Sequence, residues 1–222
     1  MRAEYYADLD ATAGAAMVRD RLVTTEEVHA AATERHLATD ETIHAVVEWY
    51  EEPTPVAATD GPLAGVPFIR KDYGSAEAGR LVEMGSRLAQ GRCATETGIF
   101  IRRLQAAGAM IVGRSAVPEF IQHGTTESVA FGATRNPHNP DYSAGGSSGG
   151  SGAAVAAGVV PAGHASDCAG SIRIPAATCG LVGLKPSRRL VPWEGGGWGG
   201  IAEEFVLTRT CLLYTSDAAD DY

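Results

Sequence analysis

The sequence lacks any long apolar run: no stretch of its 222 residues approaches the roughly 20 apolar residues of a membrane-spanning helix. It is also short of basic residues, with 18 Lys+Arg against 27 Asp+Glu and a net charge of −9. This acidic balance repels phosphate backbones and anionic lipid surfaces. We therefore expect no nucleic acid and no membrane among its partners.

Cysteine and metal-ligand patterns are sparse as well. The four cysteines form no C-x-x-C pair, and the six histidines show no H-E-x-x-H or paired-ligand spacing. The sequence therefore predicts free thiols, no metal site and no cofactor. The Met1 end is acidic and has no apolar segment of a secretory signal, so the expected compartment is the cytoplasm.

Glycine is abundant, at 27 residues, and it is clustered. Residues 145–152 read GGSSGGSG and precede the Ala/Val-rich residues 153–160, a pattern that predicts a helix beginning on a glycine loop. Composition alone leaves a flexible Gly/Ser linker open for this run. A phosphate-binding loop is disfavoured, because no Gly-Lys-Ser/Thr sequence closes the run.

Hydrophobic periodicity predicts an α/β chain. A helical segment that ends in glycine is followed by a buried strand, which is an α/β signature. Thr24 begins a capping box, which marks the start of a helix. The expected elements are helices over residues 11–22, 24–36 and 95–107, strands over residues 63–69 and 110–112, and a loop over residues 51–62.

Three short segments carry residues suited to hydrolytic chemistry. Lys71 lies in GVPFIRKDYG, Ser147 in SAGGSSGGSGAA and Ser171 in SDCAGSIRIPA. Together they resemble the amidase signature family of C–N hydrolases, and the two serines are separated by 24 residues, as are the family's catalytic serines. The resemblance covers roughly residues 3–210 and corresponds to the N-terminal half of a family member. Further matches are GSR at 85–87, PEF at 118–120, NP at 136–137 and CGLVGLKPS at 179–187.

The resemblance assigns a role to each of these residues. It implies that Ser171 is the nucleophile, that Ser147 relays the proton and is joined to Gly146 by a cis peptide bond, and that Lys71 is the base. A serine hydroxyl needs a base within hydrogen-bond reach before it attacks an amide. A lysine base must be neutral, so we expect burial and nearby positive charge, such as Arg70, to lower the pKa of Lys71.

By the same resemblance, the loop before Ser171 is expected to stabilise the oxyanion of the tetrahedral intermediate. The family carries glycine where this sequence has Ala169, and a positive φ there would strain the backbone and shift the loop. The expected oxyanion donors are the backbone N–H groups of Cys168, Ala169, Gly170 and Ser171. Asp167 is expected to hold the loop by accepting backbone N–H bonds. Arg173 is expected beside it, as a second positive charge that could lower the pKa of Lys71.

The implied fold is a three-layer α/β/α sandwich around a mixed central sheet, in truncated form. Residues 1–210 are expected to be the N-terminal portion of a single amidase domain. Residues 211–222, CLLYTSDAADDY, do not fit what precedes them, and we expect a non-native segment that is disordered or unpacked. The implied activity is hydrolysis of a small-molecule carboxylic amide through an acyl-enzyme on Ser171. The bond broken is the C–N bond of a linear amide and not a peptide bond. A homodimer of the full-length protein is left open.

Alternatives remain within and outside the family. A catalytically inactive truncated fragment is one, and the amidotransferase subunit that generates ammonia for tRNA-bound glutamate is another. The latter is disfavoured, because it usually carries glutamine where this chain has Ile174. The Trp-rich residues 195–210 resemble instead the branch of cyclic amide and nylon-oligomer hydrolases.

A cysteine nucleophile is the rival mechanism. His164 lies four residues before Cys168, and a Cys–His pair is a known nucleophile–base combination. We disfavour this pair because Cys168 falls at an oxyanion position of the amidase pattern.

Overall fold

A computed structural model describes residues 1–54, 60–193 and 200–215 of the chain. Its helices are α1 (Ala3–Asp8), α2 (Ala11–Arg19), α3 (Thr25–Ile43), α4 (Ile99–Ala106), α5 (Gly149–Ala156), α6 (Arg173–Cys179) and α8 (Leu212–Thr215), with single 3-10 turns at Arg87–Ala89 and Glu119–Ile121. Its strands are β1 (Val46–Trp49), β2 (Pro67–Lys71), β3 (Met110–Ser115), β4 (Glu127–Ser128), β5 (Gly132–Ala133), β6 (Arg135–Asn136), β7 (Asn139–Ser143), β8 (Ala162–Asp167), β9 (Val182–Gly183) and β10 (Glu203–Thr208).

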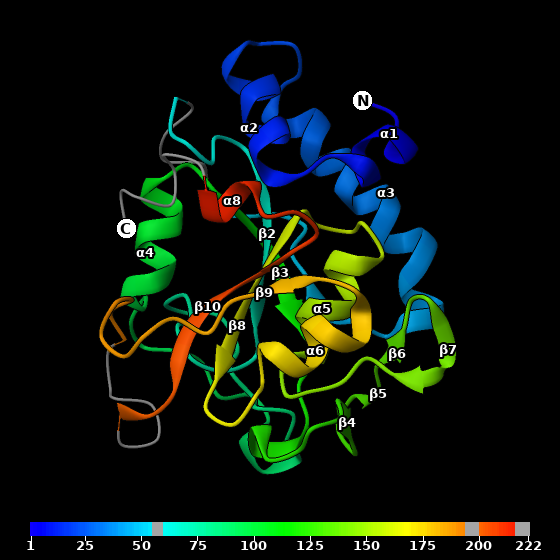
Figure 1. Cartoon of the computed structure of the whole chain (residues 1–222), viewed down its shortest axis with the longest axis vertical. Helices are drawn as coiled ribbons and strands as arrows, with labels where there is room; N and C mark the ends of the chain where they lie inside the picture. Colours follow the sequence, from blue (N-terminus) through cyan, green and yellow to red (C-terminus); the bar gives the residue numbers. More distant parts are fainter. Residues whose placement is uncertain (55–59, 194–199, 216–222) are drawn as a thin grey trace.

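A mixed sheet forms the centre of the described molecule, with six strands in the order β1-β3-β2-β8-β10-β9 (Figure 1). β2 runs parallel to its neighbours β3 and β8, whereas the outer pairs β1–β3, β8–β10 and β10–β9 are antiparallel. The ladder between β2 and β8 ends at the pair Ile69–Gly163. The two parallel strands therefore part just before Lys71.

Helices cover both faces of this sheet, because successive strand residues point to opposite sides. Phe68 and Ile111 pack with α2 and α4 on one face. Ile69 and Val112 pack with α5 on the other. Figure 1 shows α4 on one side of the strands and α5 and α6 on the other. This arrangement confirms the predicted α/β/α sandwich with a mixed sheet.

The predicted N-terminal helices form where their start signals lie. Asp10 accepts the backbone N–H of Ala13 at the start of α2, and Thr24 and Glu27 form the expected capping box of α3. α3 continues to Ile43, well beyond the predicted end at residue 36. The predicted helix over residues 95–107 is observed as the shorter α4.

The glycine-rich run is part of the core, so the linker interpretation is wrong. α5 begins at Gly149 rather than at residue 153, and its first seven residues are buried. A Cβ on Gly150 would lie 2.4 Å from the backbone N of Ala116 and 2.7 Å from the carbonyl oxygen of Ala45. Only glycine lets the helix pack so closely against the end of β3.

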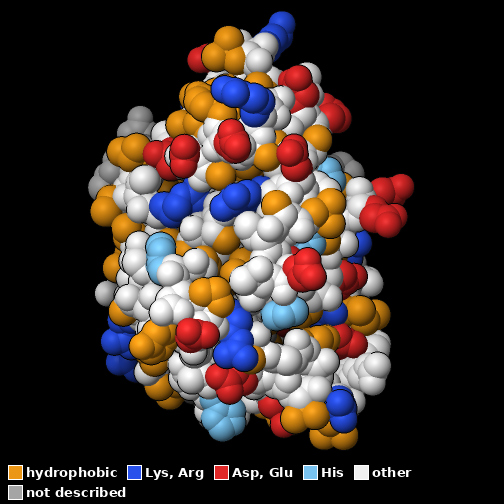
Figure 2. Space-filling view, turned by 90° about the vertical axis from the view of Figure 1, so that its right-hand side faces the viewer, with side chains coloured by type: hydrophobic (Ala, Val, Ile, Leu, Met, Phe, Trp, Pro, Cys, Tyr) orange, Lys and Arg blue, Asp and Glu red, His pale blue; other side chains and the backbone are white. Residues whose placement is uncertain are grey.

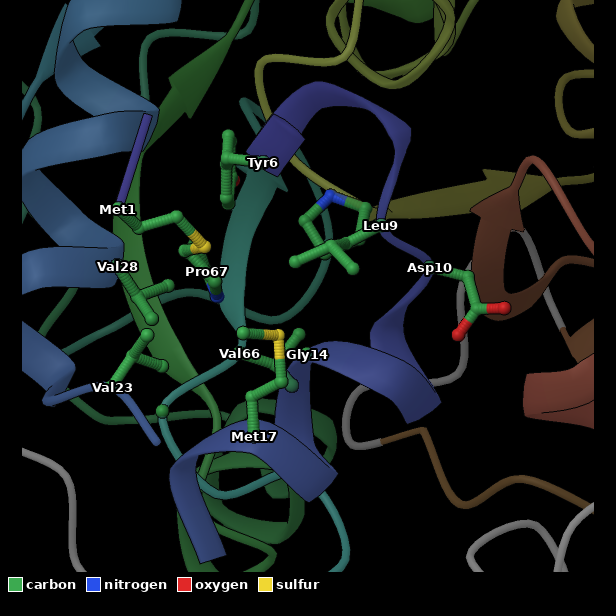
Figure 3. A pocket seen from close by; sticks show the side chains of 12 residues that line it. Met1, Tyr6, Leu9, Asp10, Gly14, Met17, Val23, Val28, Val66 and Pro67 are labelled. Atoms are coloured by element: carbon green, nitrogen blue, oxygen red, sulfur yellow. The ribbon is translucent and has the colours of Figure 1, made fainter. Parts of the chain in front are cut away.

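Helices α1, α2 and α3 contribute to a smaller core of their own. Tyr6 is buried there, and its hydroxyl donates to the carbonyl oxygen of Val159 at 2.9 Å. Side chains including Met1, Met17 and Val28 line a cavity of about 10 Å³ beside it (Figure 3). Because this cavity is apolar and no larger than one water molecule, we assign it to packing and not to binding.

The segment after β10 is described as far as Thr215 and adds no strand to the central sheet. Leu212–Thr215 form the short helix α8, and Leu213 packs against the core that contains α2 and α4. Leu212 stays exposed, so Leu213 is the one described side chain of this helix that packs on the core. The expectation of a non-native, unpacked segment over residues 211–222 therefore stays a prediction. Residues 216–222, and residues 194–199 of the Trp-rich stretch, lie outside the described ranges.

On the face shown in Figure 2, acidic, basic and hydrophobic side chains are interspersed, and neither sign of charge dominates. Within the described ranges, no helix combines the length and the apolarity that a bilayer span requires. Likewise, these ranges contain no group of three or more His, Cys, Asp or Glu side chains that could hold a metal ion.

Candidate active site

The three residues predicted to carry the chemistry come together from separate elements. Lys71 is the last residue of β2, Ser147 lies just before α5, and Ser171 lies between β8 and α6. Ser147 and Ser171 line one pocket of about 210 Å³. Nζ of Lys71 lies 2.9 Å from Oγ of Ser147. The pocket thus lies at the edge where the carboxyl ends of the parallel strands β2 and β8 meet.

The backbone before α5 sets the position of Ser147. The peptide bond between Gly146 and Ser147 is cis, as the family resemblance implied. Gly145 has a φ of +76°, a conformation that favours glycine. A Cβ on Gly146 would lie 2.7 Å from the carbonyl oxygen of Thr125, so this turn is tightly enclosed.

Lys71 is fully buried and faces three hydroxyl groups. Its Nζ lies 2.9 Å from Oγ of Ser147, 2.8 Å from Oγ of Ser148 and 3.0 Å from Oγ of Ser166. Oγ of Ser148 donates to the carbonyl oxygen of Ser166, so Ser148 accepts from the lysine. A neutral amine has two protons and one lone pair, so with three partners one of the other two hydroxyls must donate to it. Ser147 and Ser166 are therefore the two hydroxyls that can donate a proton to a neutral Lys71.

Burial controls the ionisation of Lys71. It lowers the pKa of this lysine to about 7, against the opposing effect of Asp167 and Glu204. The expected contribution from positive neighbours is wrong: the charged groups that act on Lys71 are these two carboxylates. The side chain of Arg70 points away and donates to the carbonyl oxygen of Leu81. Burial therefore favours the neutral amine that a proton acceptor requires.

Exposure increases from Lys71 through Ser147 to Ser171. Lys71 is 0% exposed and Ser147 is 2% exposed, whereas Ser171 is half-buried in the pocket wall. A substrate that enters the pocket can therefore reach Ser171 while Lys71 stays shielded from water.

Asp167 holds the loop that precedes Ser171. Its carboxylate accepts the backbone N–H groups of Gly170 at 2.7 Å and Ile172 at 3.2 Å. Arg173 binds it through two guanidinium nitrogens, at 2.9 Å and 3.0 Å. Burial favours the neutral acid, but Arg173 and these N–H groups outweigh it and hold the pKa of Asp167 below its usual range. Since the N–H of Gly170 binds Asp167, Gly170 is removed from the expected set of oxyanion donors.

The departure from the family pattern at Ala169 does not strain the loop. The positive φ of this segment falls on Gly170, at +120°, and not on Ala169. Alanine is therefore compatible with the backbone at this position. The N–H groups of Cys168, Ala169 and Ser171 remain as candidates for the oxyanion.

The rival Cys–His pair is not formed. Nδ1 of His164 accepts the backbone N–H of Lys71 at 3.3 Å, and Nε2 lies 3.3 Å from Oε1 of Glu204. Both ring nitrogens thus face groups other than Cys168. The sequence prediction missed His164, Ser166 and Glu204 as neighbours of Lys71. The alternation of His164, Ser166 and Cys168 was a usable signal, because residues two apart lie on one face of a strand.

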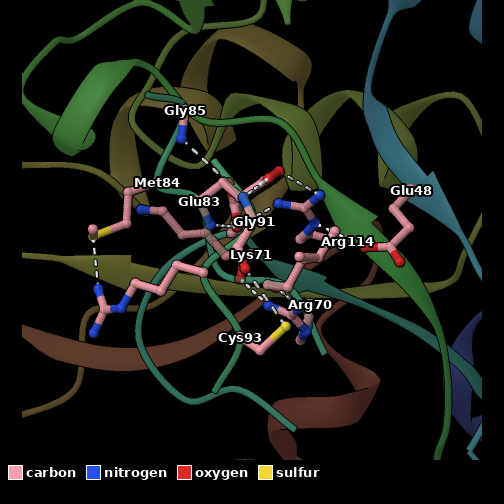
Figure 4. A network of polar contacts seen from close by, with 12 residues as sticks. Glu48, Arg70, Lys71, Glu83, Met84, Gly85, Gly91, Cys93 and Arg114 are labelled. Atoms are coloured by element: carbon pink, nitrogen blue, oxygen red, sulfur yellow. Dashed lines mark hydrogen bonds and ion pairs between the residues drawn. The ribbon is translucent and has the colours of Figure 1, made fainter. Parts of the chain in front are cut away.

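A buried ion cluster stabilises the loop after Lys71 (Figure 4). Arg114 of β3 binds Asp72 at 3.0 Å, Glu83 at 2.9 Å and Glu48 at 3.1 Å. Asp72 also accepts the backbone N–H groups of Glu83 and Gly85. Residue 72 is thus fixed to a loop more than ten residues away in sequence, which anchors the end of β2.

The fold and this pocket are those of the amidase family. The chain belongs to the amidase family, whose model matches residues 16–206. It is 42% identical over 212 residues to the 6-aminohexanoate-cyclic-dimer hydrolase of Paenarthrobacter ureafaciens, an alignment that covers 90% of this chain and 43% of that protein. Over 127 residues it is 52% identical to a glutamyl-tRNA(Gln) amidotransferase subunit from Lachnospira eligens, covering 57% of this chain and 26% of that protein.

Solved structures of the family match the fold. A structure of 6-aminohexanoate cyclic dimer hydrolase complexed with substrate superposes with a TM-score of 0.83 at 37% identity, covering 91% of this chain and 44% of that chain. The chain therefore spans less than half the length of the curated relatives it matches.

Proposed function

We propose that this chain hydrolyses a carboxylic amide through an acyl-enzyme on Ser171, with Ser147 as the proton relay and Lys71 as the base. The observation that carries the proposal is the 2.9 Å contact between Nζ of Lys71 and Oγ of Ser147, at a pocket that Ser171 lines. A buried amine with a pKa of about 7 is an effective proton acceptor at neutral pH.

In the first half of the reaction, Oγ of Ser171 attacks the carbonyl carbon of the amide. The proton of Ser171 passes to Ser147, and the proton of Ser147 passes to Lys71. The tetrahedral intermediate then collapses, the C–N bond breaks, and Lys71 returns its proton through Ser147 to the leaving nitrogen. Ammonia or an amine departs and leaves an ester on Ser171.

In the second half, a water molecule takes the place of the leaving group. It attacks the ester carbon and passes a proton through Ser147 to Lys71. When the second intermediate collapses, this proton returns to Oγ of Ser171 and the carboxylic acid departs. The contact between Ser171 and Ser147 must tighten in the substrate complex, as catalytic hydrogen bonds commonly do.

The oxyanion that forms in both halves needs donors aimed into the pocket. The backbone N–H groups of Cys168, Ala169 and Ser171 are proposed for this role, because all three residues line the pocket. Gly170 serves the loop instead, through its bond to Asp167. Asp167 and Arg173 are proposed to hold the loop, not to contact the substrate.

We propose a small-molecule amide as the substrate, and residues 1–210 as a portion of one amidase domain. The relative from Paenarthrobacter ureafaciens is named for a cyclic dimer of 6-aminohexanoate, so cyclic and linear aliphatic amides are the first substrates to test. The similarity to an amidotransferase subunit makes glutamine a necessary member of the panel.

The test is release of ammonia or amine by the 222-residue chain from linear amides, cyclic amides and glutamine. We expect release from simple amides, and a loss of about 10³-fold or more in S171A. C168S is the matched control for the rival nucleophile and should retain turnover. Release from glutamine alone would favour the amidotransferase function, and a chain that releases nothing is the inactive fragment. Turnover that survives S171A would remove the proposed nucleophile.

A further inference from the structure

A side chain from the neighbouring strand holds the backbone of Lys71. The ladder between β2 and β8 stops at Ile69–Gly163, and beyond it Nδ1 of His164 accepts the backbone N–H of Lys71 at 3.3 Å. A ring nitrogen that accepts an N–H carries no proton, so the proton of this ring lies on Nε2. At Lys71, the ring of His164 thus takes the place of the backbone carbonyl group that would accept this N–H if the β2–β8 ladder continued.

Glu204 of β10 faces that Nε2. Its Oε1 lies 3.3 Å from Nε2 of His164, and both side chains are fully buried. The same carboxylate accepts the backbone N–H of Ser75 and, at 2.6 Å, its hydroxyl. The Glu204 carboxylate therefore accepts two hydrogen bonds from Ser75 and lies within ion-pair distance of the His164 ring. A Cβ on Gly74 would lie 2.0 Å from Oε1, so glycine is required for this loop to close over Glu204.

We infer that His164 and Glu204 form a positioning pair, which holds the backbone of Lys71 and supplies a fixed negative charge near its amino group. His164 acts on the N–H of Lys71 itself, and Glu204 acts on the loop that follows it, through Ser75. The inference rests on the proposed function only in taking Lys71 as the base.

The charges around Lys71 explain why Glu204 matters. Asp167 and Glu204 both raise the pKa of Lys71 against the larger effect of burial. Asp167 is paired with Arg173 in a bidentate contact, whereas Glu204 contacts no Lys or Arg among the described residues. On β3, Arg114 is bound by its own three carboxylates, and the groups that bind Nζ of Lys71 are uncharged hydroxyls. Glu204 is thus the uncompensated negative charge beside the base.

The test replaces this charge and follows Lys71 directly. The chain has two lysines, Lys71 and Lys185, so an NMR titration of isotope-labelled lysine side chains resolves Lys71. We expect E204Q to move the titration midpoint of Lys71 to lower pH by about half a unit or more, because loss of a nearby negative charge favours the neutral amine. E203Q is the matched control: it makes the same change at the adjacent residue of β10, whose carboxylate accepts the N–H of Arg189.

Equal midpoints for Lys71 in E204Q and E203Q would overturn the inference. The protonation of the His164 ring supplies a second measurement on the unmodified chain, read from a long-range nitrogen–proton NMR spectrum and assigned with H164N. We expect the proton on Nε2, and a proton on Nδ1 would contradict the pair even if E204Q failed to fold. Neither measurement needs turnover, so a chain that hydrolyses no amide would refute the proposed function and leave the pair to be decided by NMR.

Discussion

The amino group of Lys71 is buried at the junction of three serine hydroxyls, and this burial has a consequence for stability. The folded state holds its pKa near 7, whereas its ordinary value is 10.5. Between these values the unfolded chain binds more protons than the folded chain. The contribution of Lys71 to stability therefore rises with pH across this window, and below pH 7 the full cost of burying the charge is present.

The variant K71M removes this dependence. We expect the stability of the wild type relative to K71M to increase by roughly 2–3 kcal/mol between pH 7 and about pH 9, since each pKa unit is worth about 1.4 kcal/mol. Urea unfolding at a series of pH values measures it, and K185M corrects for the loss of a lysine in general. A difference that stays constant with pH would show that Lys71 is not buried as described.

The sequence selected the candidate site residues but not the side chains that support them. Lys71, Ser147 and Ser171 each lie in a short segment that resembles the amidase signature, and that resemblance selected them. His164 and Glu204 lie in no such segment. They meet only because β8 pairs with β10, a contact between strands about 40 residues apart that local patterns do not encode. The loss of Gly170 as an oxyanion donor likewise depends on where Asp167 points.

At the scale of the element, the position of α5 depends on the glycines at its start, which carry no side chain. A Cβ on Gly149 would clash with Oγ1 of Thr126, at 2.3 Å, and a Cβ on Gly150 with the backbone of Ala116, at 2.4 Å. The N–H of Gly150 in turn donates to the carbonyl oxygen of Ala116. This contact fixes the start of the helix, and with it Ser147, against the end of β3.

The variant G150A should therefore be destabilised by about 2 kcal/mol or more, because its Cβ meets backbone that cannot move cheaply. G14A is the matched control. Gly14 lies within α2 with nothing within 4 Å of its Cβ position, so alanine there should stabilise the chain by up to about 1 kcal/mol. Thermal or urea unfolding compares the two. A G150A chain as stable as G14A would refute this packing.

The ion pairs of Arg114 lead to a second prediction at this scale, which concerns the stability of the loop after β2. R114M leaves Asp72 and Glu83 buried without their cation, which typically costs about 3–5 kcal/mol. R87M, at an exposed arginine, should change the stability by less than about 0.5 kcal/mol. The free energies of unfolding of the two variants test the cluster, and similar values for both would contradict it.

The strands were harder to predict than the helices for a physical reason. α2 carries an N-cap and apolar residues at helical spacing, and α3 carries a capping box, so the sequence marks both helices locally. β8 and β10 carry buried polar residues, His164, Ser166, Glu203 and Glu204, and so lack the apolar pattern of a buried strand. Their stability comes from partners that the fold provides, not from the sequence of the strand itself.

At the scale of the whole molecule, the site exists only where three distant segments meet. The end of β2 supplies Lys71, the turn before α5 supplies Ser147, and the loop between β8 and α6 supplies Ser171. The sheet order places β2 beside β8, and α5 covers the face over them. The central claim is therefore that these segments form one proton path from Ser171 through Ser147 to a neutral Lys71.

The most direct test of that claim is the pH dependence of fluorophosphonate labelling of the chain, with the modified residue located by mass spectrometry. We predict labelling at Ser171, with a rate that rises as Lys71 loses its proton and has its midpoint near pH 7. S171A should abolish the label and K71A should slow it. Labelling at another residue, or a rate at Ser171 that is unchanged in K71A, would contradict the account.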